Sequence, residues 1–158
     1  MSGGATQDSR PREPDRVRLL RFRVGDRACA VEVGRVAGIV DTPSPTPVPG
    51  TDPTVAGVVR LRDEVTVVGD LHRVLGTDRR LAGEDRTLVL EREADATPVA
   101  FAVDDVERLA DVHVDGIVPA EVAESDERVF VAAADTDGER VGVVGVKRFA
   151  DLLDDAVR

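Results

Sequence analysis

Three side chains could carry nucleophilic or acid–base chemistry: the single cysteine, Cys29, and the two histidines, His72 and His113. A cysteine and a histidine brought together would form a reactive dyad. Cys29, however, alternates with Val31 and Val33 along one face of a strand pattern. Free cysteine is among the most buried residue types, so we interpret Cys29 as a small core residue. We therefore expect no catalytic residues.

Metal and nucleotide motifs are missing from the sequence. It contains no cysteine pair and no His-x-x-x-His spacing, which zinc sites would need. The acidic pairs Asp104-Asp105 and Asp154-Asp155 lack a glycine-centred calcium loop, so we interpret them as solvated surface. The sequence contains neither of the phosphate-binding motifs G-x-x-x-x-G-K-[ST] and G-x-G-x-x-G. It also contains no Trp or Tyr on which nucleic-acid bases could stack. We expect no metal and no cofactor.

The charge balance bears on partners and on location. Among 158 residues, 31 acids oppose 21 bases, for a net charge of -10, and Lys147 is the only lysine. Such a surface repels nucleic-acid phosphates and anionic membranes, so we expect no nucleic acid and no membrane insertion. A single cysteine, no apolar run of about 20 residues and no signal-peptide core predict a cytoplasmic protein. An acidic, lysine-poor composition is typical of halophilic, haloarchaeal-type proteins, but GC-rich coding produces a similar bias.

The first structured segment follows a tail. Residues 1–16 are rich in small residues, prolines and balanced charges, so we expect them to be disordered. From residue 17, apolar side chains alternate with Arg21 and Arg23, which predicts a strand with one wet face. The turn residues Gly25-Asp26 then lead to a second strand over residues 28–33, and the two strands should form a hairpin.

The rest of the chain predicts further short strands and two helices. Five prolines in residues 41–53 exclude helix and regular sheet pairing, so we expect an extended connection within one domain rather than a linker between domains. Asp70 and Gly76 are typical caps for a short helix over residues 71–75. The C-terminal helix should carry one apolar stripe, Val146, Phe149, Leu153 and Val157. The remaining predicted strands are 35–40, two within 55–69, 87–90, 99–103, 106–114, 129–133 and 141–146.

About ten evenly spaced short strands favour small antiparallel barrels, and an ordered series of motifs supports a more specific identification. Over roughly residues 17–155 the sequence resembles the CheW-like domain family. The matching pieces, in chain order, are Phe22, Gly25-Asp26, Val31 to Val33, Val36 to Ile39, Val48-Pro49, Gly57 to Arg62, Asp70-Leu71, Val103-Asp104-Asp105-Val106 and Val144 to Leu153.

The resemblance implies a mainly β fold in which two five-stranded SH3-like barrels pack together, with a short helix and a C-terminal helix. The CheW-like domain would occupy residues 17–158. Its first barrel would take about 17–78, its second about 79–146, and its C-terminal helix 147–158. Strands could be exchanged between the two barrels.

The resemblance also implies a function. The chain would be a non-enzymatic chemotaxis adaptor that couples methyl-accepting receptors to the histidine kinase CheA, and it could be recruited to membrane receptor arrays. One surface would bind the signalling tip of the chemoreceptor, and others, not assignable to residues, would bind the regulatory domain of CheA. The receptor-binding residues implied are Val36, Gly38, Leu61, Arg62 and Asp63. A simpler interpretation makes Arg62 a surface residue paired with Asp63 or Glu64.

The sequence departs from the family pattern at the implied receptor site. Gly38 replaces a glutamate, and Arg60 and Asp63 replace the asparagine and final glycine of Asn-Leu-Arg-Gly. These departures predict a divergent coupling surface more than a different fold. Two alternatives remain open at this stage. One is a diverged CheW-like module in another signalling system, and the other is a small-ligand-binding or enzymatic β-barrel.

Overall fold

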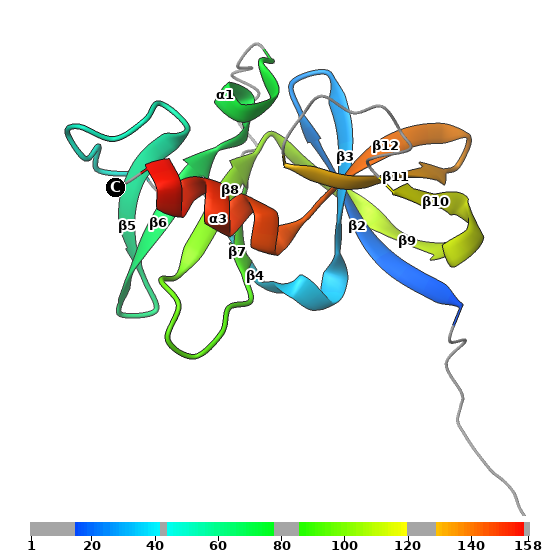
Figure 1. The fold of residues 1–158 in the computed structure, drawn as a ribbon, viewed down its shortest axis with the longest axis horizontal. Coiled ribbons are helices and arrows are strands. Elements are labelled where there is room, and N and C mark those ends of the chain that lie inside the picture. The colour runs from blue at the N-terminus through cyan, green and yellow to red at the C-terminus, as the bar shows by residue number, and fades with distance from the viewer. Residues whose placement is uncertain (1–14, 42–43, 78–85, 120–128, 157–158) are drawn as a thin grey trace, which may run out of the picture.

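The computed structural model describes residues 15–41, 44–77, 86–119 and 129–156. Most of the expected tail and the expected stripe residue Val157 lie outside these ranges. The described chain forms two sheets that lie side by side, with the C-terminal helix crossing one of them (Figure 1). The mainly β prediction is confirmed.

One sheet has six strands, and the other has five. The six-stranded sheet runs in the order β10 (Ile117–Pro119), β11 (Phe130–Thr136), β12 (Glu139–Val144), β3 (Arg27–Glu32), β2 (Arg16–Val24) and β9 (Asp105–His113). The five-stranded sheet runs in the order β4 (Val36–Asp41), β7 (Arg86–Leu90), β8 (Val99–Val103), β6 (Glu64–Asp70) and β5 (Val55–Leu61). The pairs β12–β3 and β6–β8 are parallel, and the other neighbours are antiparallel.

The sheets do not follow the chain in two consecutive halves. The N-terminal hairpin, β2 and β3, pairs with β9 and β12 from the second half of the chain. A division near residue 78 therefore does not separate the two sheets, because strands from both sides of it pair in the six-stranded sheet. The extra strand is β10, whose three residues are too few to produce a periodic signal in the sequence.

Local sequence signals account for most of the turns and caps. Gly25 has a φ of 60° in the turn between β2 and β3, a conformation that glycine adopts without strain. The helix α1 (Leu71–Leu75) begins after Asp70, whose side chain accepts a hydrogen bond from the backbone N–H of Arg73. It ends at Gly76, which has a φ of 69°. The helix caps predicted from the sequence are thus confirmed.

The proline segment meets the edge of β5 at one point. Thr46 exchanges two backbone hydrogen bonds with Val58, of 2.9 and 3.0 Å, as an isolated bridge. The backbone approaches so closely here that a Cβ on Gly57 would collide with the carbonyl group of Thr46. Gly57 also has a φ of 149°, so glycine is required for both reasons. Outside residues 42–43, which are not described, the segment forms no helix and pairs with the sheet at this one bridge, but residues 49–50 and 53–54 form turns rather than the extended conformation predicted.

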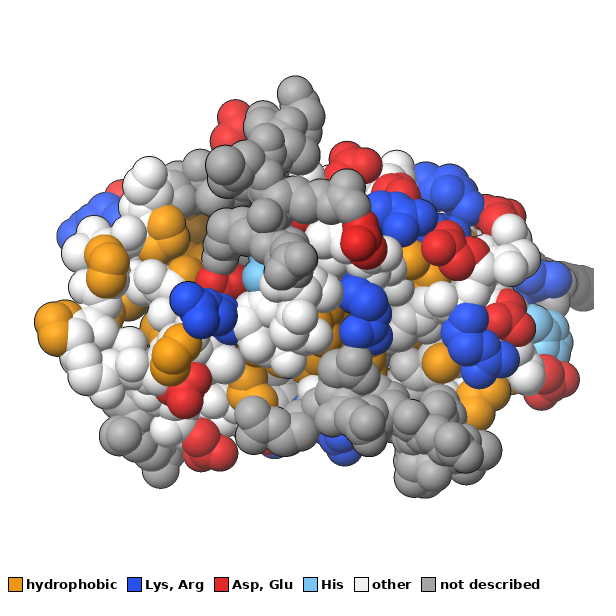
Figure 2. Space-filling view, turned by 90° about the horizontal axis from the view of Figure 1, so that it is seen from above, with side chains coloured by type: hydrophobic (Ala, Val, Ile, Leu, Met, Phe, Trp, Pro, Cys, Tyr) orange, Lys and Arg blue, Asp and Glu red, His pale blue; other side chains and the backbone are white. Residues whose placement is uncertain are grey.

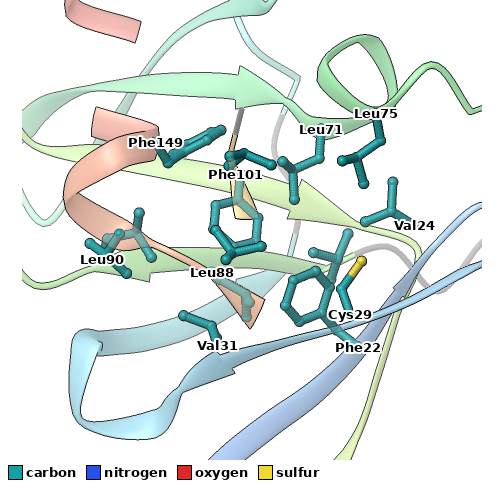
Figure 3. Close-up of a cluster of buried hydrophobic side chains, with 14 of the residues drawn as sticks. Phe22, Val24, Cys29, Val31, Leu71, Leu75, Leu88, Leu90, Phe101 and Phe149 are labelled. Atoms are coloured by element: carbon teal, nitrogen blue, oxygen red, sulfur yellow. The ribbon is translucent and has the colours of Figure 1, made fainter. Parts of the chain in front are cut away.

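The larger of two apolar clusters in the described residues lies between the two sheets (Figure 3). Phe22 of β2 and Phe101 of β8 have ring centroids 5.5 Å apart, and Phe101 meets Phe149 of α3 (Val146–Ala156) edge to face at 5.1 Å. Cys29 is fully buried in this core, which confirms its interpretation as a core residue. Because both sheets and α3 contribute rings to one cluster, burial of that cluster stabilises the whole assembly.

The expectation of a wet face on β2 is wrong for Arg21, whereas the side chain of Arg23 is 34% exposed. Arg21 is only 3% exposed, because the side chains of Glu107, Thr136 and Glu139, from β9, β11 and β12, contact its guanidinium. The face opposite the central core packs in a second apolar cluster, which contains Leu19, Ala30, Val112, Ala134, Val141 and Val143. Alternation in the sequence indicated the two faces correctly, but it could not show that the second face is covered too.

Candidate functional site

The implied receptor-binding residues lie where the two edges of the five-stranded sheet approach each other. β4 and β5 are the outermost strands and do not pair with each other. Even so, a Cβ on Gly38 in β4 would lie 2.5 Å from Nη2 of Arg62, which follows β5. The sheet therefore curls enough for the turn after β5 to reach the face of β4, and the missing side chain of Gly38 leaves room for the guanidinium.

The turn that carries Arg62 has an unusual backbone. Leu61 pairs with Glu64, so Arg62 and Asp63 form a two-residue hairpin loop. Their φ angles are 52° and 64°, the left-handed conformation at both positions that type I′ turns require. Asparagine and glycine usually occupy such positions, and a left-handed conformation costs an ordinary L-residue about 1–2 kcal/mol. Strain of this kind is concentrated at functional sites.

The charge of Arg62 is not neutralised by the residues that the structure describes. Glu64 pairs with Arg92, with 2.5 Å between Oε2 and Nη2, and no ion pair or hydrogen bond to Arg62 is found in those ranges. The simpler interpretation, in which Arg62 pairs with Asp63 or Glu64, is therefore wrong. An exposed guanidinium with five donors and no partner is well suited to bind a carboxylate from another molecule.

Apolar side chains lie on the same strands. Ile39 of β4 is 46% exposed and Val65 of β6 is 57% exposed, the largest exposed fractions among the bigger described hydrophobic residues of this sheet. A cavity of about 280 Å³ on the same sheet is lined by Leu61, Arg62 and Arg92, among others, but not by Ile39 or Val65. Sequence reasoning missed Ile39, Val65 and Arg92. Ile39 and Val65 could have been found in the sequence, because each is a large aliphatic residue next to an exposed position of its strand.

The five implied residues are not equivalent. Gly38, Leu61 and Arg62 lie together at this edge, and Asp63 is exposed at the tip of the turn. Val36 is half-buried, packs against the central core and pairs with Leu90. Val36 therefore positions β4 more than it presents a surface of its own.

His72 and Asp104 form a buried pair. His72 is 5% exposed and Asp104 is 7% exposed, and His72 Nε2 lies 2.8 Å from Asp104 Oδ1. The expectation that Asp104-Asp105 is solvated surface is thus wrong for Asp104, although Asp105 is exposed. The reason is topological, because Asp104 lies where the chain passes from β8 into β9, between the two sheets.

The residues that could have formed a dyad have separate partners. His113, at the end of β9, binds Asp15 across 2.8 Å, and the Sγ of Cys29 lies 3.9 Å from the carbonyl oxygen of Arg27. The two histidines thus contact acidic residues on different elements, and neither bonds to Cys29. In the four described ranges, no group of three or more His, Cys, Asp or Glu side chains could hold a metal ion. No helix in those ranges is long and apolar enough to cross a membrane.

The six-stranded sheet carries an ionic cluster of four side chains, Arg21, Arg23, Glu107 and Glu139. Arg21 Nη2 lies 2.6 Å from Glu139 Oε1, and Arg23 Nε lies 2.8 Å from Glu107 Oε2. Glu107 and Glu139 each contact both arginines. The hydrogen bond from Arg21, and then the charge of Arg23, hold the pKa of Glu139 below its ordinary value. The hydrogen bond to Glu107 likewise raises the pKa of Arg23.

Charged side chains of both signs are interspersed over the upper face of the six-stranded half (Figure 2). Apolar side chains gather on the same face over the five-stranded half (Figure 2). Together with Arg62, which has no ion-pair partner among the described residues, and the exposed Ile39 and Val65, these features define a mainly β protein suited to bind other proteins through its surface.

Comparison with known families identifies the chain more closely. The CheW-like domain model matches residues 18–154, so the chain belongs to the CheW-like domain family. It is 29% identical over 96 residues to the chemotaxis protein CheW of Bacillus subtilis (strain 168), a match that spans 61% of each protein. It also resembles the crystal structure of the scaffolding protein TtCheW from Thermoanaerobacter tengcongensis. That likeness has a TM-score of 0.73 at 20% identity and covers 82% of this chain and 89% of that one.

Proposed function

We propose that this chain is a non-enzymatic chemotaxis adaptor that couples methyl-accepting receptors to the histidine kinase CheA. Family membership over residues 18–154 supports the general role. The observation that carries the specific proposal is the unpaired guanidinium of Arg62, displayed by a strained turn over Gly38. The adaptor acts by position in the cytoplasm, where it holds receptor and kinase together so that receptor conformation biases kinase activity.

The receptor-facing surface lies at the edge formed by β4 and the β5–β6 turn. Arg62 supplies a positive charge in a chain whose net charge is -10, and Ile39 and Val65 supply exposed apolar area on β4 and β6 of the same sheet. A complementary partner presents a carboxylate next to apolar side chains, which suits an amphipathic helical hairpin such as a receptor signalling tip. The family glutamate is absent at Gly38, so the carboxylate for Arg62 comes from the partner.

The domain that performs this role comprises residues 17–158. The surface that contacts the regulatory domain of CheA is not assigned to residues. Any such surface has to leave the Arg62 edge free, because an adaptor must bind both partners at once.

Isothermal titration calorimetry with the full chain tests the proposal. The partners are a soluble receptor signalling-tip hairpin and the isolated regulatory domain of CheA. Arg62→Ala should weaken receptor binding roughly tenfold or more, as removal of an interface arginine typically does. Arg140→Ala is the matched control, because Arg140 is an exposed arginine on the other sheet. It should leave receptor binding unchanged.

Three results would contradict the proposal in different ways. Equal affinities for wild type and Arg62→Ala would remove Arg62 from the receptor site. A large fall in melting temperature for Arg62→Ala would show that the residue is structural. Binding to the kinase domain without any receptor binding would favour the alternative of a diverged module in another signalling system.

A further inference from the structure

Asp104 occupies the point at which the chain crosses from one sheet to the other. It follows β8 of the five-stranded sheet and precedes β9 of the six-stranded sheet. Its backbone N–H donates to the carbonyl oxygen of Arg23 in β2, across 2.9 Å. The residue is nearly fully buried, so its carboxylate has to find its hydrogen-bond donors inside the protein.

The carboxylate of Asp104 receives one donor from each half of the molecule. Oδ2 accepts the backbone N–H of Gly25 across 2.7 Å, and Gly25 lies in the turn between β2 and β3 of the six-stranded sheet. Oδ1 lies 2.8 Å from His72 Nε2, and His72 lies in α1, directly after β6 of the five-stranded sheet. Figure 1 shows α1 beside the β2–β3 turn, the two elements that this carboxylate joins.

The imidazole of His72 is itself held from its other side. Its Nδ1 lies 3.0 Å from Thr77 Oγ1, and the backbone N–H of Thr77 donates to the carbonyl oxygen of His72, also across 3.0 Å. A carboxylate only accepts hydrogen bonds, so His72 Nε2 must carry the proton that is shared with Asp104. In the neutral form of the ring, Nδ1 then accepts the hydroxyl proton of Thr77.

The hydrogen bonds of Asp104 can fix the relative orientation of the two sheets, which the apolar core alone does not. The core between the sheets gains its stability from burial, which is non-directional and tolerates small sliding movements of one sheet over the other. Hydrogen bonds at 2.7 and 2.8 Å are directional, and a buried carboxylate that loses them is strongly destabilised. We propose that Asp104 is a positioning residue that fixes the orientation of the two sheets by joining the Gly25 turn to His72.

Asp104→Asn keeps the shape of the side chain and replaces one carboxylate oxygen by an NH₂ group. The amide oxygen of asparagine can still accept from Gly25, while its NH₂ group faces His72 Nε2. The ring can then move its proton to Nδ1 and donate to Thr77, because a hydroxyl group also accepts hydrogen bonds. Asp104→Asn should therefore keep both connections with the tautomer of His72 reversed. Asp104→Ala should lose both connections.

Two measurements on the full chain test this assignment. The first is nitrogen NMR of the histidine rings above about pH 8, where an ordinary imidazole is neutral. Wild type and the control Asp105→Asn should show His72 protonated at Nε2, and Asp104→Asn should show it protonated at Nδ1. An unchanged tautomer in Asp104→Asn would overturn the proposal, even if Asp104→Ala fails to fold.

The second measurement is the distance between spin labels on the two sheets. The labels are placed at Arg60→Cys and Arg140→Cys in a Cys29→Ala background, since both arginines are exposed and lie on different sheets. Wild type, Asp105→Asn and Asp104→Asn should give one narrow distribution, and Asp104→Ala a broader or shifted one. A folded Asp104→Ala with the wild-type distribution would overturn the proposal, and so would an Asp104→Asn that broadens.

Discussion

The guanidinium of Arg62 lies over the α-carbon of Gly38, so close that a Cβ at position 38 would come within 2.5 Å of Nη2. The two residues are 24 positions apart in the sequence and belong to opposite edges of one sheet. A glycine where the family has glutamate and an arginine without a described partner are therefore one structural feature. The guanidinium occupies the space of the missing side chain.

Gly38→Ala should displace Arg62 without disturbing the fold. The colliding atom is the end of a flexible side chain, so the arginine can swing aside, and alanine suits a strand better than glycine. We expect a change in unfolding free energy within about 0.5–1 kcal/mol and a loss of receptor affinity in the same direction as for Arg62→Ala. Chemical denaturation and calorimetry with the signalling-tip hairpin measure the two quantities. Wild-type receptor affinity would show that the position of Arg62 over Gly38 is unimportant.

The strained Arg62-Asp63 turn should lower the stability of the protein while it places Arg62 for receptor binding. Replacing Arg62-Asp63 by Asn-Gly, the sequence that type I′ turns prefer, should raise the unfolding free energy by about 1 kcal/mol and abolish the Arg62 contact with the receptor. The matched control is the Asp137-Gly138 turn, where φ is 52° and 81°. Gly138→Ala should lower stability by about 1 kcal/mol, because alanine is strained at that φ. Urea denaturation compares all three proteins. Asn-Gly without a gain in stability would mean that the turn is not strained.

Gly142→Ala should be much more damaging than Gly34→Ala. A Cβ on Gly142 would lie 2.7 Å from ring atoms of Phe130, which is fully enclosed in the core, whereas a Cβ on Gly34 would have no atom within 4 Å. Overpacking of this kind typically costs about 1–3 kcal/mol. We expect that loss for Gly142→Ala and a change within about 0.5 kcal/mol for Gly34→Ala, measured by thermal unfolding. Similar melting temperatures for the two variants would contradict the close packing.

The ionic cluster should make stability fall in acid. The pKa of Glu139 is lower in the folded protein than in the unfolded chain, because the folded carboxylate is bound by Arg21 and Arg23. The resulting stabilisation is fully present above the ordinary glutamate pKa of about 4.3 and is lost as the pH falls through the lower, folded value. Glu139→Gln should thus show a flatter decline of melting temperature below about pH 4.3 than wild type, with Glu93→Gln as the control. Parallel declines in wild type and Glu139→Gln would count against the contribution of this pair.

The salt response distinguishes the two explanations of the composition. If the net charge of -10 reflects adaptation to high salt, molar potassium chloride should raise the melting temperature strongly by screening repulsion among the acidic side chains. A flat response would favour GC-rich coding as the source of the arginine and alanine bias. Differential scanning calorimetry over a range of salt concentrations decides between them.

Much of the fold could be predicted because the relevant signals are local. The turn at Gly25-Asp26, the caps Asp70 and Gly76, and the alternation in β2 each depend on a few neighbouring residues. The burial of Cys29 follows from its alternation with Val31. By contrast, β10 has only three residues, and no periodic pattern can be recognised over so short a run.

The candidate site was only partly predictable, because its properties depend on which strands meet. Residue patterns alone were enough to predict the β-rich class, the hairpins, the helix ends, the family and the interest of Gly38 and Arg62. Three-dimensional contacts were needed to show that Arg62 fills the space over Gly38, that Glu64 pairs with Arg92, and that Asp104 is buried between the sheets. Local conformational preferences act within a few residues. Strand pairing and side-chain burial depend on contacts between segments that are far apart in the sequence.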